Sequence, residues 1–195
     1  MPELISPMQS SFIPGRQVTG NIIVMQELLH TMKRKVGTKG WMAIKLDLEK
    51  AYDRVRWDFI RDTLIRMKLP DSLIEVIMSC VTTSSLSILW NGEPSESFKP
   101  TRGIRQGDPL SPYLFVACME RLSQLINTLQ RGGRWKAIPV SRGGTKISHL
   151  MFADDVVLFG EASAEQAHMI RSCLNEFCEW SGQKVNTQNE YLFLS

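Results

Sequence analysis

The stretch LMFADDVVLF, residues 150–159, places two adjacent carboxylates, Asp154 and Asp155, between two short apolar runs. Each run is rich in β-branched, aromatic or other bulky apolar residues, so it predicts a buried strand, and the polar break between the runs predicts a hairpin turn. Aspartate is also common in turns for structural reasons, because its side chain satisfies local backbone donors. The stretch by itself therefore leaves open a structural turn and a catalytic one.

A third carboxylate follows another apolar run, WMAIKLD, residues 41–47. This run predicts a strand that ends at or near Asp47. Acids are almost never buried without a partner, so Asp47 should reach the rim of a sheet or meet a cation. If this strand neighbours the Asp154–Asp155 hairpin, three carboxylates converge. Mg²⁺ binds through one or two carboxylates plus substrate phosphates, and a pair of such ions supports phosphoryl transfer, so the acids indicate nucleotidyl transfer.

The rest of the chain alternates helical and strand patterns. Apolar residues recur at helical spacing over 21–35, 48–67, 71–77, 114–129 and 163–178. Local signals add a helix cap at Asp71, a tight hairpin at Asn91-Gly92, a capping box at Ser163 and Gln166, a helix end at Gly182 and a strand over 191–194.

Composition indicates an ordinary globular protein. A chain of 195 residues with 43% hydrophobic content can bury a sizeable core, and a net charge of +3 is too small to establish nucleic-acid binding. No apolar run approaches the roughly 20 residues of a membrane span, and the N-terminal residues lack the order of a signal peptide. We therefore expect an intracellular protein, nuclear or cytoplasmic. The four cysteines lack metal-ligand spacing and should be small buried residues.

Two segments combine glycine with arginine. The loop TRGIRQGDPLSP, residues 101–112, predicts a helix start, with Asp108 or Ser111 as cap and Pro109 or Pro112 in the first turn. An arginine-bearing loop that leads into a helix N-terminus can bind an anion, although a plain loop-to-helix transition fits equally well. Arg16 follows the Pro14-Gly15 turn, where its side chain can reach a phosphate or simply lie at the surface.

Three motifs carry a family resemblance: KLDLEKAYD at 45–53, GIRQGDPLSP at 103–112 and FADD at 152–155. Together they resemble the reverse transcriptases of LINE-type, non-LTR retrotransposons, in the style common in plant genomes. Residues 9–17, the Asn91-Gly92 hairpin and SGQKVN at 181–186 also fit that family, in the same order, so the resemblance covers nearly the whole chain.

The resemblance implies an α+β fold. Residues 41–195 would form mainly the palm of a right-hand polymerase, an antiparallel sheet covered by helices, and residues 1–40 part of the fingers. The thumb, the rest of the fingers and the endonuclease region of the parent element would be missing from this stretch.

The resemblance also implies an RNA-directed DNA polymerase. Asp47, Asp154 and Asp155 would bind two Mg²⁺ ions, with Mn²⁺ as an alternative. The 3′-hydroxyl of a DNA primer would attack the α-phosphate of an incoming dNTP on an RNA template.

Further contacts follow from the same resemblance. Tyr52 would be a steric gate under the sugar that excludes a ribose 2′-hydroxyl, although an aromatic core residue at a strand–helix junction fits its position too. Gln106 and Gly107 would lie against the nucleotide and template, and Arg105 and Arg16 would contact phosphates.

The late motif departs from the family. Where family members carry a lysine that assists pyrophosphate departure, this chain has Asn189 followed by Glu190. A neutral amide cannot donate that proton, and a carboxylate adds the wrong charge beside a phosphate. Two other interpretations therefore stay open: an inactive nucleic-acid-binding remnant of a retroelement and, favoured least by the motifs, an intron maturase-like protein.

Overall fold

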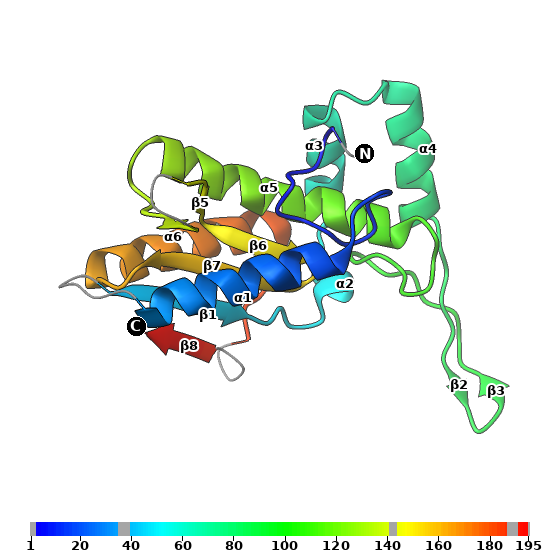
Figure 1. The fold of residues 1–195 in the computed structure, drawn as a ribbon. Coiled ribbons are helices and arrows are strands. Elements are labelled where there is room, and N and C mark those ends of the chain that lie inside the picture. Colours follow the sequence, from blue (N-terminus) through cyan, green and yellow to red (C-terminus); the bar gives the residue numbers. More distant parts are fainter. Residues whose placement is uncertain (1–2, 35–39, 141–143, 187–190, 195) are drawn as a thin grey trace.

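The computed structural model describes residues 3–34, 40–140, 144–186 and 191–194. Its centre is a four-stranded antiparallel sheet in the order β6-β7-β1-β8 (Figure 1). The strands are β1 (Trp41–Leu46), β6 (His149–Phe152), β7 (Asp155–Glu161) and β8 (Tyr191–Leu194). All four apolar runs that predicted these strands are confirmed, and the antiparallel sheet agrees with the predicted fold class.

The central pairing joins strands that lie far apart in the sequence. β1 pairs with β7 from Trp41 opposite Glu161 to Leu46 opposite Val156. β8 occupies the other edge of β1, with Met42 opposite Leu194. The carboxylate-bearing ends of β1 and β7 are therefore neighbours in the sheet.

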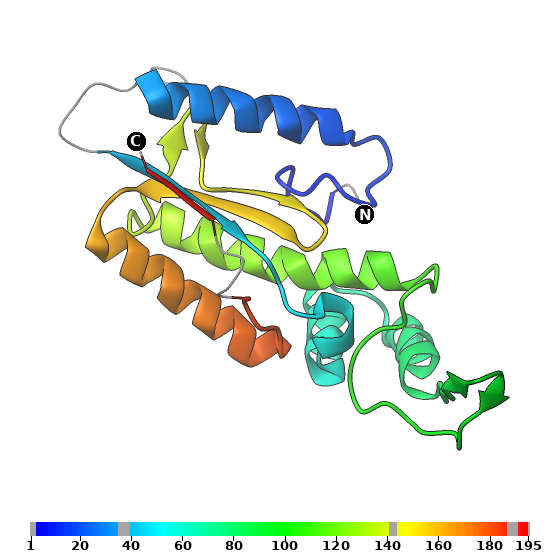
Figure 2. The ribbon, with the colours of Figure 1, turned by 90° about the horizontal axis from the view of Figure 1, so that it is seen from below.

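Helices cover both faces of the sheet. Figure 2 shows α1 (Val18–Arg34) on one side and the pair α5 (Ser111–Arg131) and α6 (Ala164–Ser181) on the other. Successive side chains of β1 alternate between these layers, as the pleat of a strand requires. Trp41 and Ala43 belong to the core beneath α1, whereas Met42 and Leu46 belong to the larger core shared with α5 and α6. None of the described helices is both long and apolar enough to span a bilayer.

The helix predicted over 48–67 is wrong as a single element. The structure has a short α2 (Ala51–Arg54) and a separate α3 (Trp57–Arg66), with Val55 and Arg56 in extended conformation between them. The backbone N–H of Arg56 donates to the carbonyl of Ser181 at 2.9 Å, so the break is held by a contact with the end of α6. Apolar spacing cannot reveal such a contact, because its partner lies more than a hundred residues away.

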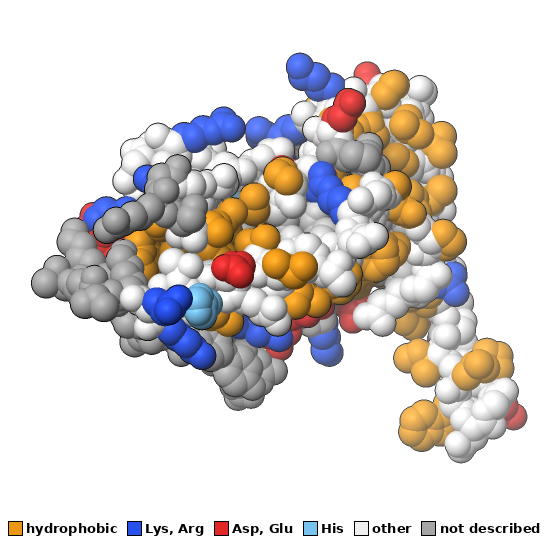
Figure 3. All heavy atoms as spheres, viewed as in Figure 1, with side chains coloured by type: hydrophobic (Ala, Val, Ile, Leu, Met, Phe, Trp, Pro, Cys, Tyr) orange, Lys and Arg blue, Asp and Glu red, His pale blue; other side chains and the backbone are white. Residues whose placement is uncertain are grey.

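The hairpin predicted at Asn91-Gly92 is confirmed. β2 (Leu89–Trp90) and β3 (Glu93–Pro94) flank a turn in which both central residues have positive φ, 52° and 85°. The hairpin projects from the body of the molecule beyond α4 (Asp71–Thr82), and apolar side chains lie exposed on it (Figures 1 and 3). A second small sheet pairs β4 (Ile138–Pro139) with β5 (Lys146–Ile147).

Several predicted helix caps need correction. Asp71 does not cap α4 but is its first residue, after Pro70. Neither Asp108 nor Ser111 caps α5, whose N-cap is Leu110. Instead, the Asp108 carboxylate accepts a hydrogen bond from the Leu110 N–H at 2.8 Å within the loop. Short polar side chains close such local turns as readily as they cap helices, so sequence alone does not separate the two roles.

The capping box of α6 is half confirmed. The Ser163 hydroxyl accepts from the Gln166 N–H at 3.2 Å, and Gly182 ends the helix with a φ of 78°. The Gln166 side chain, however, turns away from the cap. It accepts from the Lys136 N–H at 2.9 Å and donates to the Arg134 carbonyl at 2.8 Å. A buried amide with two long-range partners has taken the place of the reciprocal capping bond.

The cysteine prediction holds for two of the four side chains. Cys118 and Cys173 are buried, Cys178 is partly buried, and Cys80 is exposed. Cys80 lies on α4, beyond the 71–77 stretch whose apolar spacing predicted that helix, so the spacing did not indicate which face it occupies.

Candidate active site

The sheet brings the predicted carboxylates to one rim. Asp47 directly follows β1, and Asp155 begins β7. Continuing the register one residue past the Leu46–Val156 pair sets Asp47 opposite Asp155. The turn itself consists of Ala153 and Asp154, so the two adjacent acids do not share it, as the sequence suggested, but occupy the turn and the start of the next strand.

Two neighbours hold these carboxylates in place. The Lys45 ammonium lies 3.2 Å from an Asp155 carboxylate oxygen, with both side chains about half exposed. The Asn186 side-chain amide donates to the Asp47 carboxylate at 3.1 Å, and the Asn186 backbone N–H donates to the Asp47 carbonyl at 2.8 Å. Sequence reasoning missed Lys45 as a site residue. The signal was present, because residues two apart on a strand share one face and Lys45 stands two before Asp47.

The donor set suits a hard divalent cation, since Asp154 and Asp155 are exposed carboxylate residues and Asp47 is a partly exposed one. Among the described residues, no three His, Cys, Asp or Glu side chains are already gathered as a metal cluster. Mg²⁺ does not require one, because it is bound through one or two carboxylates together with substrate phosphates and water. The residues therefore fit such an ion by chemistry and by their position at the rim.

Tyr52 of α2 lies next to the turn. Its ring stacks on Phe115 of α5, with centroids 4.7 Å apart and planes at 12°. Burial raises the pKa of the Tyr52 hydroxyl, and the negative charge of Asp154 acts in the same direction. Tyr52 is thus a partly exposed aromatic packed at a strand–helix junction, and its role as a steric gate stays a prediction.

The loop that carries Arg105, Gln106 and Gly107 is anchored to α2 and to the residues that follow it. The Gly103 N–H donates to the Val55 carbonyl at 2.7 Å, and the Ile104 N–H donates to the Tyr52 carbonyl at 2.9 Å. Gly103 has a φ of +87°, and a Cβ built there would lie 2.7 Å from the Asp53 carbonyl oxygen. Only glycine allows this approach, which sets the loop beside Tyr52.

The same loop borders a cavity of about 340 Å³. Arg105 and Gln106 line it together with Asp53 and the end of α4. The side chains of Arg105 and Gln106 are exposed, and Gly107 has a φ of +85° with open space around its Cα. The structure therefore places these three predicted contacts side by side on an accessible loop.

Arg16 lies elsewhere. Its guanidinium donates to the backbone carbonyls of Ile5, Ser6 and Gln9, the last two at 2.5 and 2.6 Å. These bonds fold the N-terminal residues around the side chain. The phosphate contact expected of Arg16 stays a prediction, and the contacts in the structure give it a structural task.

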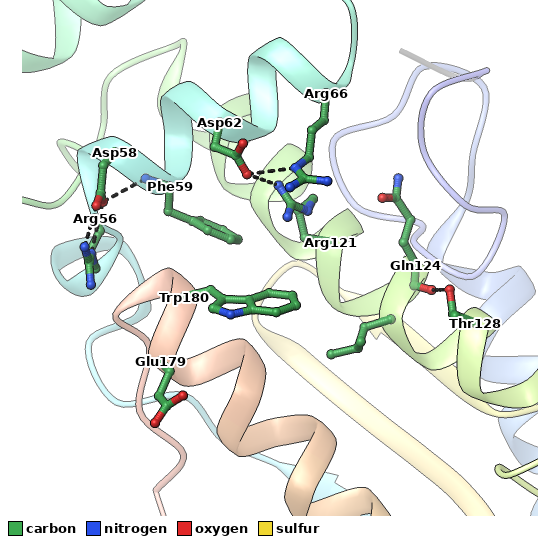
Figure 4. A pocket seen from close by; sticks show the side chains of 11 residues that line it. Arg56, Asp58, Phe59, Asp62, Arg66, Arg121, Gln124, Thr128, Glu179 and Trp180 are labelled. Atoms are coloured by element: carbon green, nitrogen blue, oxygen red, sulfur yellow. Dashed lines mark hydrogen bonds and ion pairs between the residues drawn. The ribbon is translucent and has the colours of Figure 1, made fainter.

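Of two further cavities, one borders the site and the other does not. One of about 350 Å³ lies between α1 and the sheet, and Lys45, Asp155 and Phe152 are among its lining residues. The other, of about 530 Å³, lies on the helical layer and contains none of the predicted site residues (Figure 4). There the Asp62 carboxylate of α3 accepts hydrogen bonds from Arg66 and from Arg121 of α5. The bond from Arg121 is the main cause that holds the pKa of this carboxyl below its usual range. This second cavity is a place where ion pairs join α3 to α5.

Comparison with known proteins shows which family the chain belongs to. Residues 1–189 match the family model described as reverse transcriptase (RNA-dependent DNA polymerase). A retrovirus-related Pol polyprotein from a type-2 retrotransposable element of Drosophila melanogaster is 29% identical over 181 residues, which are 92% of this chain and 16% of that polyprotein. A Pol polyprotein from the type-1 retrotransposable element R2 of Nasonia vitripennis is 33% identical over 81% of this chain and 14% of its own length.

Shorter and more distant similarities agree. An uncharacterized mitochondrial protein of Arabidopsis thaliana is 51% identical over 70 residues, 36% of this chain and 57% of that protein. Among solved structures, apo telomerase from Candida tropicalis, truncated from its C-terminal domain, superposes with a TM-score of 0.67 at 17% identity, over 95% of this chain and 36% of the telomerase. The last likeness shows the fold alone. Together the family match over residues 1–189 and the paired carboxylate strands show that the chain belongs to the reverse transcriptase family of RNA-dependent DNA polymerases.

Proposed function

We propose that Asp47, Asp154 and Asp155 bind two Mg²⁺ ions, or Mn²⁺ in their place, for nucleotidyl transfer to a DNA primer on an RNA template. The observation that carries the proposal is the β1–β7 register, whose continuation by one residue sets Asp47 across from Asp155 beside the Asp154 turn. When bound, the ions would activate the primer 3′-hydroxyl and stabilise the leaving oxygen of the dNTP. Lys45 supplies a positive charge at this rim that offsets part of the carboxylate repulsion.

The neighbouring residues would select and orient the nucleotide. Tyr52, stacked on Phe115, presents a ring that is fixed from behind and therefore suits a steric gate against a ribose 2′-hydroxyl. Gln106 and Gly107 would lie against the nucleotide and the template, and Arg105 would contact phosphate. Arg16 is kept as a weaker phosphate contact because its guanidinium already donates to backbone carbonyls. By the same proposal, residues 41–195 form mainly palm and residues 1–40 part of the fingers.

Primer extension on an RNA template tests this function. The 195-residue chain should extend a DNA primer with dNTPs only when Mg²⁺ or Mn²⁺ is present. Asp154→Asn and Asp155→Asn keep side-chain size and remove one charge each, so each should abolish extension. Glu93→Gln, on the projecting hairpin, removes an exposed charge far from the rim and should leave extension unchanged. Extension that survives both aspartate substitutions would refute the assignment of the site.

A second candidate is an inactive nucleic-acid-binding remnant, suggested by Asn189 and Glu190 in the late motif. Both residues lie outside the described part of the structure. This candidate predicts RNA binding that weakens steeply with salt and no nucleotide transfer under any metal. Extension by the unmodified chain separates the two candidates, because any nucleotide transfer excludes the inactive remnant. Asn189→Lys should then raise the extension rate of the active polymerase.

A further inference from the structure

The N-terminal residues form a strap beside the β6 edge of the sheet. We use that term for residues 5–16. Arg16 closes the strap on itself by donating to the carbonyls of Ile5, Ser6 and Gln9. The Glu120 carboxylate of α5 accepts from the Ser6 N–H at 2.8 Å and fastens the strap to the helical layer. The strap is therefore held at a fixed position relative to the strands beside it.

The strap also bonds to the edge of β6, the strand that leads into the carboxylate turn. The Met151 N–H donates to the Met8 carbonyl at 2.9 Å, and the Ser10 N–H donates to the Met151 carbonyl at 3.2 Å. Asn21, at the start of α1, donates its side-chain amide to the Met8 and Met151 carbonyls at 3.2 and 3.1 Å. Between these bonds, Gln9 is set directly against the turn.

Gln9 makes its side-chain bonds to the turn itself. The side chain is 1% exposed. Its amide oxygen accepts from the Ala153 N–H at 3.1 Å and from the Ser11 N–H at 3.0 Å. Its amide nitrogen lies 3.5 Å from the Ala153 carbonyl oxygen, to which it donates. One buried amide thus binds both polar backbone groups of the residue that precedes Asp154.

Ala153 needs such support. Its φ is +53°, a left-handed conformation that is unfavourable for any residue with a Cβ. Residues in this region persist only where the surroundings determine them, and they concentrate at functional sites. The backbone direction at Ala153 fixes where Asp154 points and where Asp155 enters β7. A change at Ala153 would therefore move two of the three carboxylates.

We infer that Gln9 is a positioning residue for the carboxylate turn: its amide selects the left-handed conformation of Ala153 and thereby sets the geometry of Asp154 and Asp155. The inference rests on the proposed function, because that proposal assigns metal binding to Asp154 and Asp155. Glutamine suits the position because its amide offers an acceptor and a donor together.

A matched pair of substitutions tests this role. Gln9→Met removes the amide and keeps the side-chain volume. Gln166→Met is the control, because Gln166 is also 1% exposed and its amide also bonds distant backbone groups, the Lys136 N–H and the Arg134 carbonyl, near the opposite end of β7. Both substitutions remove buried side-chain bonds to the backbone, three at Gln9 and two at Gln166, and both should lower stability. Only Gln9→Met should raise the Mg²⁺ concentration for half-maximal extension, by about tenfold, as loss of a residue that orients metal ligands does.

The turn conformation supplies a rescue. Glycine adopts a positive φ without the steric penalty of a Cβ. Ala153→Gly added to Gln9→Met should therefore lower the Mg²⁺ requirement back toward that of the parent chain. Ala153→Gly added to Gln166→Met should leave it unchanged. Rescue of the Gln9 variant alone would show that Gln9 acts through the Ala153 backbone rather than through general stability.

Two measurements without polymerisation keep the inference separate from the proposed function. Amide hydrogen exchange over residues 150–158 should speed up in Gln9→Met and not in Gln166→Met. Mn²⁺ binding, followed by electron paramagnetic resonance, should weaken in Gln9→Met alone. If the parent chain extends no primer while both differences are seen, the proposed function fails and the role of Gln9 stands. Equal exchange over 150–158 in the two variants, or equal changes in metal requirement, would overturn the role of Gln9.

Discussion

Gly103→Ala should be among the most damaging single-methyl additions to this chain. The new Cβ would lie 2.7 Å from the Asp53 carbonyl oxygen and 3.0 Å from its carbonyl carbon, and both are backbone atoms that cannot rotate away. Gly107→Ala is the matched control. Gly107 has nearly the same φ, +85° against +87°, and a Cβ there would meet nothing within 4 Å. The pair therefore separates the cost of backbone conformation from the cost of contact.

The expected magnitudes follow from the structure. A left-handed alanine costs about 1–2 kcal/mol, and this should be the whole effect of Gly107→Ala. At Gly103 the clash must also displace the loop from α2. That displacement breaks the Gly103–Val55, Ile104–Tyr52 and Trp57–Gly103 hydrogen bonds, at about 1 kcal/mol each. Gly103→Ala should therefore lower the free energy of unfolding by about 4–5 kcal/mol, about 3 kcal/mol more than the control.

Urea unfolding followed by tryptophan fluorescence measures both variants against the parent chain. The denaturant slope should stay constant, so that a shift in midpoint reports stability alone. Trp57 adds a local signal, because its indole N–H donates to the Gly103 carbonyl at 2.7 Å and should lose that partner only in Gly103→Ala. If the two alanine variants differ by less than about 1 kcal/mol, the close approach of the loop to Asp53 is not what requires glycine.

Further predictions concern pH, substrate choice and thiol reactivity. Burial lowers the pKa of His149 to about 4 from 6.5, so between these pH values the unfolded chain binds a proton at His149 and the folded chain does not. The free energy of unfolding should therefore fall by about 3 kcal/mol as the pH drops from 6.5 to 4. His149→Asn should flatten that part of a pH–stability profile. Under the proposed function, Tyr52→Val should raise ribonucleotide incorporation relative to dNTPs at least tenfold, whereas Tyr52→Phe should not; equal discrimination by both variants would exclude the steric gate. Iodoacetamide should modify the exposed Cys80 in the folded protein but Cys118 only after unfolding, because burial raises the pKa of the Cys118 thiol to about 12. Timed labelling followed by peptide mass spectrometry measures the two rates. Equal labelling rates for Cys80 and Cys118 in the folded protein would contradict the burial of Cys118.

The strands of the site could be predicted because their signal is local. Apolar runs before Asp47 and on both sides of Asp154–Asp155 indicate three strands, and the polar break indicates a turn. Their adjacency does not follow from composition or periodicity. It rests on a register between segments more than a hundred residues apart, which the resemblance of three ordered motifs implied and the β1–β7 pairing confirms.

Residues that act through long-range backbone bonds could not be predicted. Gln9 and Gln166 look like polar residues in a loop and a helix cap, and nothing within a few positions marks either as a buried amide with distant partners. Arg16 is a further example. Its position after a Pro-Gly turn suggests an exposed guanidinium, but the guanidinium donates to the Ser6 and Gln9 carbonyls, and residue spacing does not predict how the backbone brings those carbonyls to it. The break between α2 and α3 has the same origin.

The pairing of β1 with β7 also has a consequence during synthesis. At about 5–20 residues per second, β1 leaves the ribosome roughly 5–20 s before β7, its main hydrogen-bonding partner. For that interval an apolar strand with both edges unpaired is exposed to other chains, and such strands are templates for aggregation. Slowing translation within residues 47–155 should lengthen this interval and lower the soluble yield more than the same slowing after residue 161, when only the β8 edge of β1 is still unpaired.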